Sequence, residues 1–234
     1  MQRPTLLLLH GAMGSPATLA PLTELLSADF NVKTFAFAGH GGREVDLATF
    51  TLPHFAEEVL TFLKTHETAP VHVFGYSMGG YAALLAAHHE PAQFASITTL
   101  GTKLDWSQES AAAEIRLLDP EKMLAKVPTF VEVLRQRHAP ADWAAVVRAT
   151  ASMMTAAGAS PPLTAVDFAA LQVPVQVLMG DGDLTSERGD ASKVLAQHLP
   201  QGRYEVLPNT PHPIERVDIA DLASRIRGFA VSHA

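Results

Sequence analysis

Short apolar runs alternate with amphipathic stretches along most of the chain. The runs are bounded by glycine, proline or polar residues and are mostly apolar on both faces, as in parallel strands covered on two sides. Between them, apolar residues recur at helix spacing, for example at Phe55, Val59 and Leu63. This alternation implies right-handed crossovers and an α/β fold with a doubly wound, mostly parallel sheet. We expect strands at 5–9, 32–37, 71–76, 96–100, 175–179 and 204–207.

One region interrupts the alternation. Residues 104–173 contain no strand pattern, and helix-like stretches occupy 111–118, 120–126, 129–137 and 142–155. No obvious linker precedes this region, and strands lie on both sides of it. We therefore interpret residues 1–234 as a single domain in which residues 104–173 form a helical cap over the ends of the strands.

A candidate nucleophile lies near the middle of the chain. Residues 75–79 read Gly-Tyr-Ser-Met-Gly, a G-x-S-x-G motif between a strand pattern and an Ala/Leu-rich helix pattern. Such a tight strand-to-helix turn strains the serine backbone and needs small residues two positions before and after it. The motif alone occurs often by chance, but this context predicts that Ser77 is a catalytic nucleophile.

A serine nucleophile needs a base and a group that orients the base, and two later strand ends supply candidates. His212 follows the strand at 204–207, whereas the other histidines favour structural or solvated positions. Asp183 follows the strand at 175–179 and is the preferred acid; Asp181, which could instead cap a turn, and Asp105 remain alternatives. Loops at the carboxyl edge of a parallel sheet converge, so these side chains could meet Ser77.

The oxyanion of an acyl-transfer reaction needs donors as well. The first strand runs into His10-Gly11-Ala12, and backbone N–H groups in such a turn act together with that of the residue after the nucleophile. We expect the Ala12 and Met78 N–H groups to form the oxyanion hole. His10 is expected to be structural.

Composition narrows the function classes. The net charge of −7 and the absence of a basic run argue against nucleic-acid or anionic-membrane partners. With no cysteine, disulfides, thiolate metal sites and cysteine nucleophiles are excluded. The apolar run Leu6 to Leu9 is too short for a signal peptide or a membrane helix, so a cytoplasmic location is expected.

Four ordered motifs identify a family resemblance. HGAMG at 10–14, GYSMGG at 75–80, GDGD at 180–183 and the late Pro211-His212 resemble the landmarks of the α/β-hydrolase superfamily, as does AGHGG at 38–42. The resemblance covers nearly the whole chain. It implies a serine–histidine–acid triad with a backbone oxyanion hole and no metal or cofactor, and it implies that the insertion is the helical cap of such enzymes.

Two departures from the family pattern stand out. The HG strand starts almost at Met1, so the antiparallel strands that often precede it are expected to be missing, leaving about six strands. The family's D-x-P-G-H-G loop becomes AFAGHG at 36–41, with Ala36 for the aspartate and Ala38 for the proline.

The expected activity is a serine hydrolase that cleaves a small-molecule carboxylic ester or related acyl bond through an acyl-enzyme. Two alternatives stay open, namely a C–C hydrolase or lyase that uses the triad as a base, and a non-catalytic ligand-binding member of the fold. Cap residues should set specificity, with Trp106, Phe130 and Trp143 as candidate substrate contacts. The sequence leaves the oligomeric state and the natural substrate open.

Overall fold

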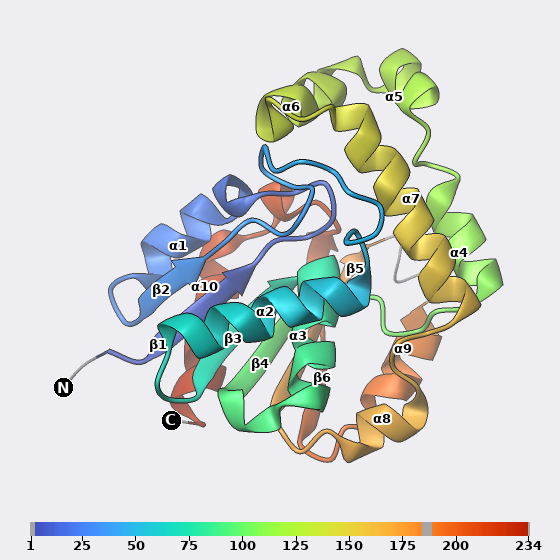
Figure 1. Ribbon diagram of the computed structural model, residues 1–234. Helices are drawn as coiled ribbons and strands as arrows, with labels where there is room; N and C mark the ends of the chain where they lie inside the picture. The colour runs from blue at the N-terminus through green and yellow to red at the C-terminus, as the bar shows by residue number, and fades with distance from the viewer. Residues whose placement is uncertain (1–2, 184–188, 234) are drawn as a thin grey trace.

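The computed structural model describes residues 3–183 and 189–233 (Figure 1). Within these residues, six parallel strands form one sheet in the order β2-β1-β3-β4-β5-β6, which confirms the predicted doubly wound sheet of about six strands. The strand order reverses between β1 and β3, where open α/β sheets place their ligand crevice. The strands are β1 (Thr5–Leu9), β2 (Asn31–Thr34), β3 (Val71–Tyr76), β4 (Phe94–Leu100), β5 (Val175–Gly182) and β6 (Gly202–Pro211).

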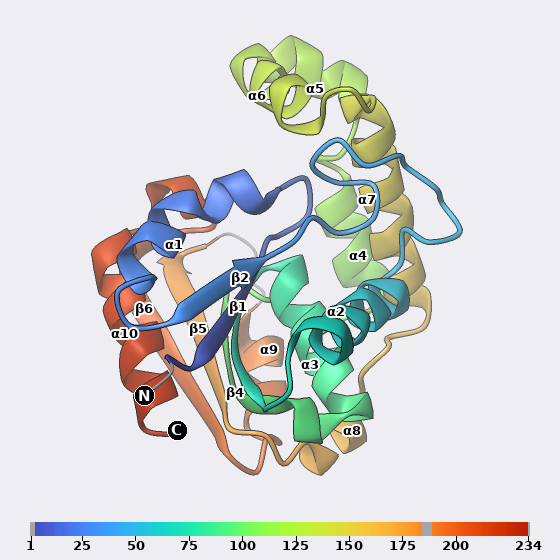
Figure 2. The same cartoon turned by 60° about the vertical axis from the view of Figure 1, so that its left-hand side comes forward.

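Helices cover both faces of the sheet and extend beyond one of its edges (Figures 1 and 2). The α-helices are α1 (Ala20–Leu26), α2 (Leu52–His66), α3 (Met78–His89), α4 (Gln108–Ile115), α5 (Pro120–Lys126), α6 (Pro128–His138), α7 (Trp143–Ala159), α8 (Ala165–Ala170), α9 (Gly189–Ala196) and α10 (Ile219–Val231). Short 3₁₀ turns occupy Pro16–Leu19, Pro91–Gln93 and Ile214–Arg216, the last labelled η4.

The leucine run of β1 divides the core into two layers. Leu7 and Leu9 face a cluster formed with α2 and α3, and Leu6 and Leu8 face a cluster formed with α1 and α10. Successive strand side chains point to opposite faces, so an uninterrupted apolar run is what a strand buried on both faces requires. The sheet is thereby fixed on both sides, and its carboxyl edge is a rigid platform for loops.

Several strand boundaries differ from the sequence prediction, most of all at the carboxyl ends of β2, β5 and β6. β5 runs to Gly182 instead of Met179. β2 ends at Thr34, three residues early, because the chain leaves the sheet there and the Phe37 N–H donates to His10 Nε2 instead of to a strand. β6 continues to Pro211 rather than stopping at Leu207, because its pairing with β5 resumes after an irregularity, with Gly182 opposite Pro211. These ends lie at the edge that holds the candidate site.

The unusual loop at 36–41 has its own support. The Ala38 N–H donates to Glu58 Oε2 of α2 at 2.8 Å, a bond that a proline at this position could not make. Arg43 Nη1 donates to Glu58 Oε1 and to the Ala36 carbonyl, each at 2.6 Å. Glu58 and Arg43 therefore hold the loop where the family pattern has aspartate and proline.

The insertion between β4 and β5 consists of helices. α4 and α7 pack against each other, and α5 and α6 lie farthest from the sheet (Figure 1). We call α4–α7 the cap. α8 also falls within the predicted 104–173 segment, but its Phe168 is buried in the main core and the helix contacts α3. None of the described helices is long and apolar enough to cross a membrane.

Candidate active site

Ser77 occupies the sharp turn between β3 and α3. Its backbone has φ 51° and ψ −116°, a left-handed conformation that few non-glycine residues adopt. The Ser77 N–H donates to the Leu100 carbonyl at 2.8 Å, and the Ser77 carbonyl accepts from Thr102 Oγ1 at 3.0 Å. Because residues at the end of β4 and just after it bind both its N–H and its carbonyl, the strained residue has little freedom to relax.

The glycines around Ser77 permit this turn. A Cβ on Gly75 would lie 2.4 Å from the Gly80 Cα, and one on Gly79 would lie 2.6 Å from the Leu9 and His10 carbonyl oxygens. A Cβ on Gly80 would lie 2.1 Å from Thr102 Oγ1, a third constraint that the motif did not suggest. Each contact is shorter than real Cβ atoms show, so the three positions are closed to side chains.

His212 and Asp183 meet at the end of β5 and β6. His212 Nδ1 lies 2.7 Å from Asp183 Oδ2, and the Asp183 side chain is only 1% exposed whereas that of His212 is 30% exposed. With Nδ1–H donating to the carboxylate, the neutral ring keeps Nε2 as an acceptor. The Tyr76 hydroxyl donates to the His212 carbonyl at 2.9 Å and fixes the loop.

The alternative acids have other contacts. Asp181 Oδ1 accepts from the Thr210 N–H of the neighbouring strand β6 at 3.2 Å, a contact between strands and not the cap of the following turn that was considered for it. The Asp105 N–H approaches Ser192 Oγ at 3.4 Å at the start of the insertion. Of the three aspartates, Asp183 is the one in contact with His212.

Gly101 is a site residue that the sequence analysis missed. A Cβ here would lie 3.1 Å from both Asp183 Oδ2 and His212 Nδ1, and the backbone has φ 61°. The contact between Asp183 and His212 therefore leaves little room for a side chain at the end of β4, and the positive φ favours glycine there. The signal was a glycine directly after a strand, which by itself marks only a turn.

The turn after β1 presents Ala12 and Met13. The Gly14 N–H donates to the Gly11 carbonyl at 3.0 Å, and Met13 has φ 57°. His10 is fully buried behind the turn, with Nδ1 2.8 Å from the Gly11 carbonyl. Its contacts are with backbone groups of neighbouring loops, which agrees with the structural role expected for it.

Three buried histidines support this corner of the site. The ring centroids of His10 and His40 are 5.0 Å apart, and those of His40 and His138 are 5.9 Å apart. Burial lowers the pKa of His10 to about 4 and that of His40 well below its ordinary value. Burial, assisted by the Arg137 charge, also lowers the pKa of His138. All three rings are therefore neutral at pH 7.

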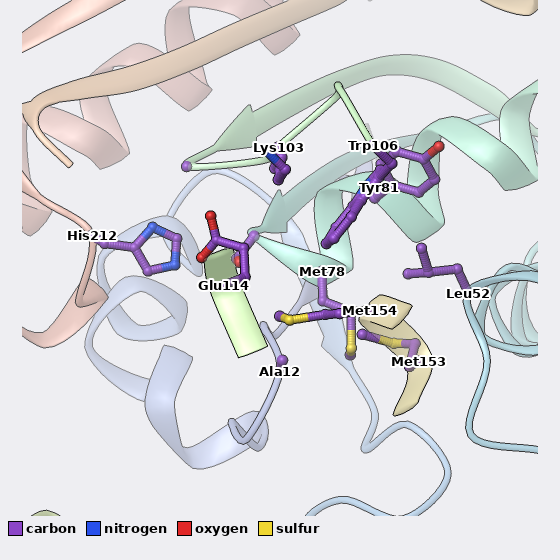
Figure 3. A pocket seen from close by; sticks show the side chains of 12 residues that line it. Ala12, Leu52, Met78, Tyr81, Lys103, Trp106, Glu114, Met153, Met154 and His212 are labelled. Carbon is purple, nitrogen blue, oxygen red and sulfur yellow. The ribbon is translucent and has the colours of Figure 1, made fainter. Parts of the chain in front are cut away.

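A pocket of about 70 Å³ joins Ser77, His212 and the candidate oxyanion donors (Figure 3). In Figure 3, His212 lies at one end and Leu52 at the other, with Met78, Met153 and Met154 between them and Glu114 near His212. The residues that line the pocket are Ala12, Leu52, Ser77, Met78, Tyr81, Gly101, Lys103, Trp106, Glu114, Met153, Met154 and His212.

The predicted substrate contacts separate into two groups. Trp106 lines the pocket, and Lys103 Nζ lies 5.6 Å from its ring centroid. Phe130 is 39% exposed on the cap, and Trp143 packs in a cap cluster under Arg135, so neither lies at the pocket. Leu52 and Tyr81 line it from the main body, whereas the substrate contacts predicted from the sequence were all in the cap segment.

Among residues 3–183 and 189–233, no group of three or more histidine, aspartate or glutamate side chains is arranged to hold a metal ion.

Comparison with known proteins supplies an independent assignment of the fold. The profile of the Alpha/beta hydrolase family matches residues 6–222. A solved thermophilic esterase from Thermogutta terrifontis superposes with a TM-score of 0.79 at 22% identity, covering 100% of this chain and 92% of that one. At that identity the likeness concerns the fold.

The curated relatives match over a smaller part of the chain. A pimeloyl-[acyl-carrier protein] methyl ester esterase of Aromatoleum aromaticum is 35% identical over 102 residues, which are 44% of this chain and 38% of that protein. A putative carbamate hydrolase, RutD, of Caulobacter vibrioides is 28% identical over 151 residues, 60% of this chain and 52% of that one. The matches thus span about half or less of the relatives' length, and the relatives are named as an esterase and as a carbamate hydrolase.

Proposed function

Since this chain belongs to the Alpha/beta hydrolase family, we propose that it is a serine hydrolase of small carboxylic esters that uses Ser77, His212 and Asp183. The observation that chiefly supports the proposal is the 2.7 Å contact of the buried Asp183 with His212, which lines the same pocket as Ser77. The esterase names of the distant relatives agree with it.

In the proposed reaction, His212 Nε2 takes the Ser77 hydroxyl proton as Oγ attacks the ester carbonyl carbon. The tetrahedral oxyanion accepts hydrogen bonds from the Ala12 and Met78 N–H groups. When the C–O bond to the alkoxide breaks, imidazolium His212 gives its proton to the leaving alcohol. Water, deprotonated by His212, then attacks the acyl-enzyme and releases the carboxylic acid and Ser77.

Asp183 has an electrostatic role in this scheme. Its carboxylate holds the Nδ1–H tautomer of His212 and stabilises the imidazolium that forms in each half-reaction. The His212 side chain is 30% exposed and lines the pocket, where its Nε2 would face the Ser77 hydroxyl.

The pocket favours a short acyl group. Its volume of about 70 Å³ is well below the ~300–1,000 Å³ of sites for drug-sized ligands. Leu52, Met78, Tyr81 and the two cap methionines supply an apolar lining. The proposed substrates are therefore esters whose acyl part is small and apolar.

The test is turnover of p-nitrophenyl esters from acetate to octanoate, together with fluorophosphonate labelling. Wild type should cleave the short esters and label, and Ser77→Ala should lose both, with kcat reduced by about 10⁶-fold. Ser160→Ala, at the exposed end of α7, is the matched control and should behave as wild type. Labelling without turnover of any ester would refute the esterase assignment and favour a C–C bond or elimination substrate, whereas absence of labelling would refute Ser77 as an activated nucleophile.

A further inference from the structure

The turn that carries Ala12 has an unusual conformation for its sequence. A hydrogen bond from the fourth residue (Gly14) to the first (Gly11) and a positive φ at the third are features of a type II turn. Glycine usually occupies the third position, but here it is Met13 with φ 57°. A side chain in this region strains the backbone, so the turn needs support from outside itself.

That support comes from the cap. The Met13 carbonyl accepts from Arg137 Nη1 and from His138 Nε2, each at 3.0 Å. Both donors belong to the last turn of α6, more than 120 residues along the chain. His138 is fully buried and its Nδ1 accepts from the Gly41 N–H at 3.2 Å, so its ring bridges two loops of the main body.

Arg137 also reaches the other side of the site. Its Nη2 donates to Glu215 Oε1 of η4 at 2.9 Å, three residues after His212. The Arg137 side chain is only 12% exposed, so this pair is better shielded from solvent than the other cap ion pairs. One guanidinium fork therefore links the turn that holds Ala12 to the loop that holds His212.

We propose that Arg137 and His138 are positioning residues through which the cap holds the 11–14 turn in register with Ser77 and His212. This inference rests on the proposed function, because it gives the Ala12 N–H the role of an oxyanion donor. Neither residue is among those that line the pocket. They act on the Met13 carbonyl, one residue after the donor.

We call the bonds of Arg137 and His138 to the Met13 carbonyl the clamp. Loss of the clamp should lower kcat more than it changes KM. The oxyanion exists only in the transition state and the tetrahedral intermediate, so a displaced Ala12 N–H weakens binding of those species and not of the ground state. A misplacement of about 1 Å costs on the order of 10²-fold in rate. Arg137→Ala should therefore reduce kcat on a short ester by about 10- to 100-fold with a nearly unchanged KM.

Two variants of α6 control this measurement. Arg137→Lys should recover part of kcat, because an ammonium still donates to the Met13 carbonyl without spanning both partners. Arg135→Ala removes an arginine two residues earlier that contacts Glu132 and Trp143 of the cap, and its kcat should stay within about twofold of wild type. Equal kcat losses in Arg137→Ala and Arg135→Ala would mean general weakening of the cap and would overturn the proposal.

A double-variant cycle tests the fork. Glu215→Gln should lower kcat less than Arg137→Ala, since the Arg137 bond to Met13 remains. The double variant Arg137→Ala/Glu215→Gln should be no slower than Arg137→Ala alone. Fully additive losses would show that Glu215 acts independently of Arg137.

Hydrogen exchange separates the clamp from the proposed chemistry, since it needs no substrate. The Gly14 amide, bonded to the Gly11 carbonyl, should exchange faster in Arg137→Ala than in wild type or Arg135→Ala. If wild type cleaves no ester, the proposed function fails while faster exchange still supports the clamp. Unchanged exchange at Gly14 overturns the clamp whatever the ester result.

Discussion

Two aspartates at the end of β5, two residues apart, have different partners. Asp183 is buried against His212, and the exposed Asp181 accepts from the Thr210 N–H. We expect Asp183→Asn to reduce kcat by about 10⁴-fold, because the amide favours the wrong tautomer of His212. Asp181→Asn is the matched control and should retain kcat within about twofold, because an amide oxygen can still accept from Thr210. Steady-state ester kinetics decides between them, and a reversed order of losses would transfer the acid role to Asp181.

Gly101 allows a second single-residue comparison. A methyl group there would press on both Asp183 and His212, and the φ of 61° adds about 1–2 kcal/mol of strain. Gly101→Ala should therefore lower both kcat and the melting temperature. Gly228→Ala, on α10 with no atom within 4 Å of the added Cβ, should leave kcat unchanged and raise the free energy of unfolding by about 0.5–1 kcal/mol. Equal kcat in wild type and Gly101→Ala would show that the acid–base contact tolerates the methyl group.

At the scale of elements, α7 contributes Met153 and Met154 to the lining of the pocket. Met154 lies on this helix, lines the pocket and is only partly buried, so its truncation should enlarge the site at little cost in folding. Met154→Ala should shift the preferred p-nitrophenyl ester by about two to four carbons toward longer acyl groups, since each methylene contributes about 0.8 kcal/mol when buried.

The control for this shift is on the same helix. Trp143→Ala removes a larger side chain from the first turn of α7, away from the pocket. It should lower the melting temperature without changing the chain-length profile. A shifted profile in Trp143→Ala, or an unshifted one in Met154→Ala, would mean that acyl length is read elsewhere.

Elements with strong local patterns could be predicted from the sequence. The apolar runs predict the sheet of about six strands, and the positions of Ser77, Asp183 and His212 directly after strands predict them as candidate site residues. Other features depend on contacts between distant segments. Gly101 matters because of side chains about 80 and 110 residues away, and Arg137 because of Met13, 124 residues away. Phe130 and Trp143 are aromatic residues of the kind that line substrate pockets, but the packing of the cap helices places them away from the pocket. The spacing of residues in the sequence does not determine that packing.

For the whole molecule, buried neutral histidines predict sensitivity to acid. The pKa of His10 is about 4 in the folded chain and near 6.5 when unfolded, so between these values the unfolded chain binds a proton that the folded chain does not. The contribution of neutral His10 to the free energy of unfolding is fully present above pH 6.5. It is lost as the pH drops toward 4, which lowers the free energy of unfolding by up to about 3 kcal/mol from His10 alone. The lowered pKa values of His40 and His138 act in the same direction.

Urea unfolding at pH 7.5, 6.0 and 5.0 measures this loss. His10→Gln keeps one donor and one acceptor but does not titrate, so its unfolding free energy should depend less steeply on pH. NMR titration of the histidine rings gives the same information without a substitution. A wild-type stability that is constant between pH 7.5 and 5.0 would contradict the prediction.

The insertion leaves the sheet after β4 and returns at β5, and these two strands are neighbours. The two ends of the insertion are therefore close together. Another helical segment could replace α4–α7 between the same two strands, in evolution or by design, and would form a different pocket over Ser77. The bonds from α6 to the Met13 carbonyl restrict that freedom. A foreign module without donors at that place would bring new selectivity to a weakened catalyst, so successful grafts should be those that inherit or reinvent the contact.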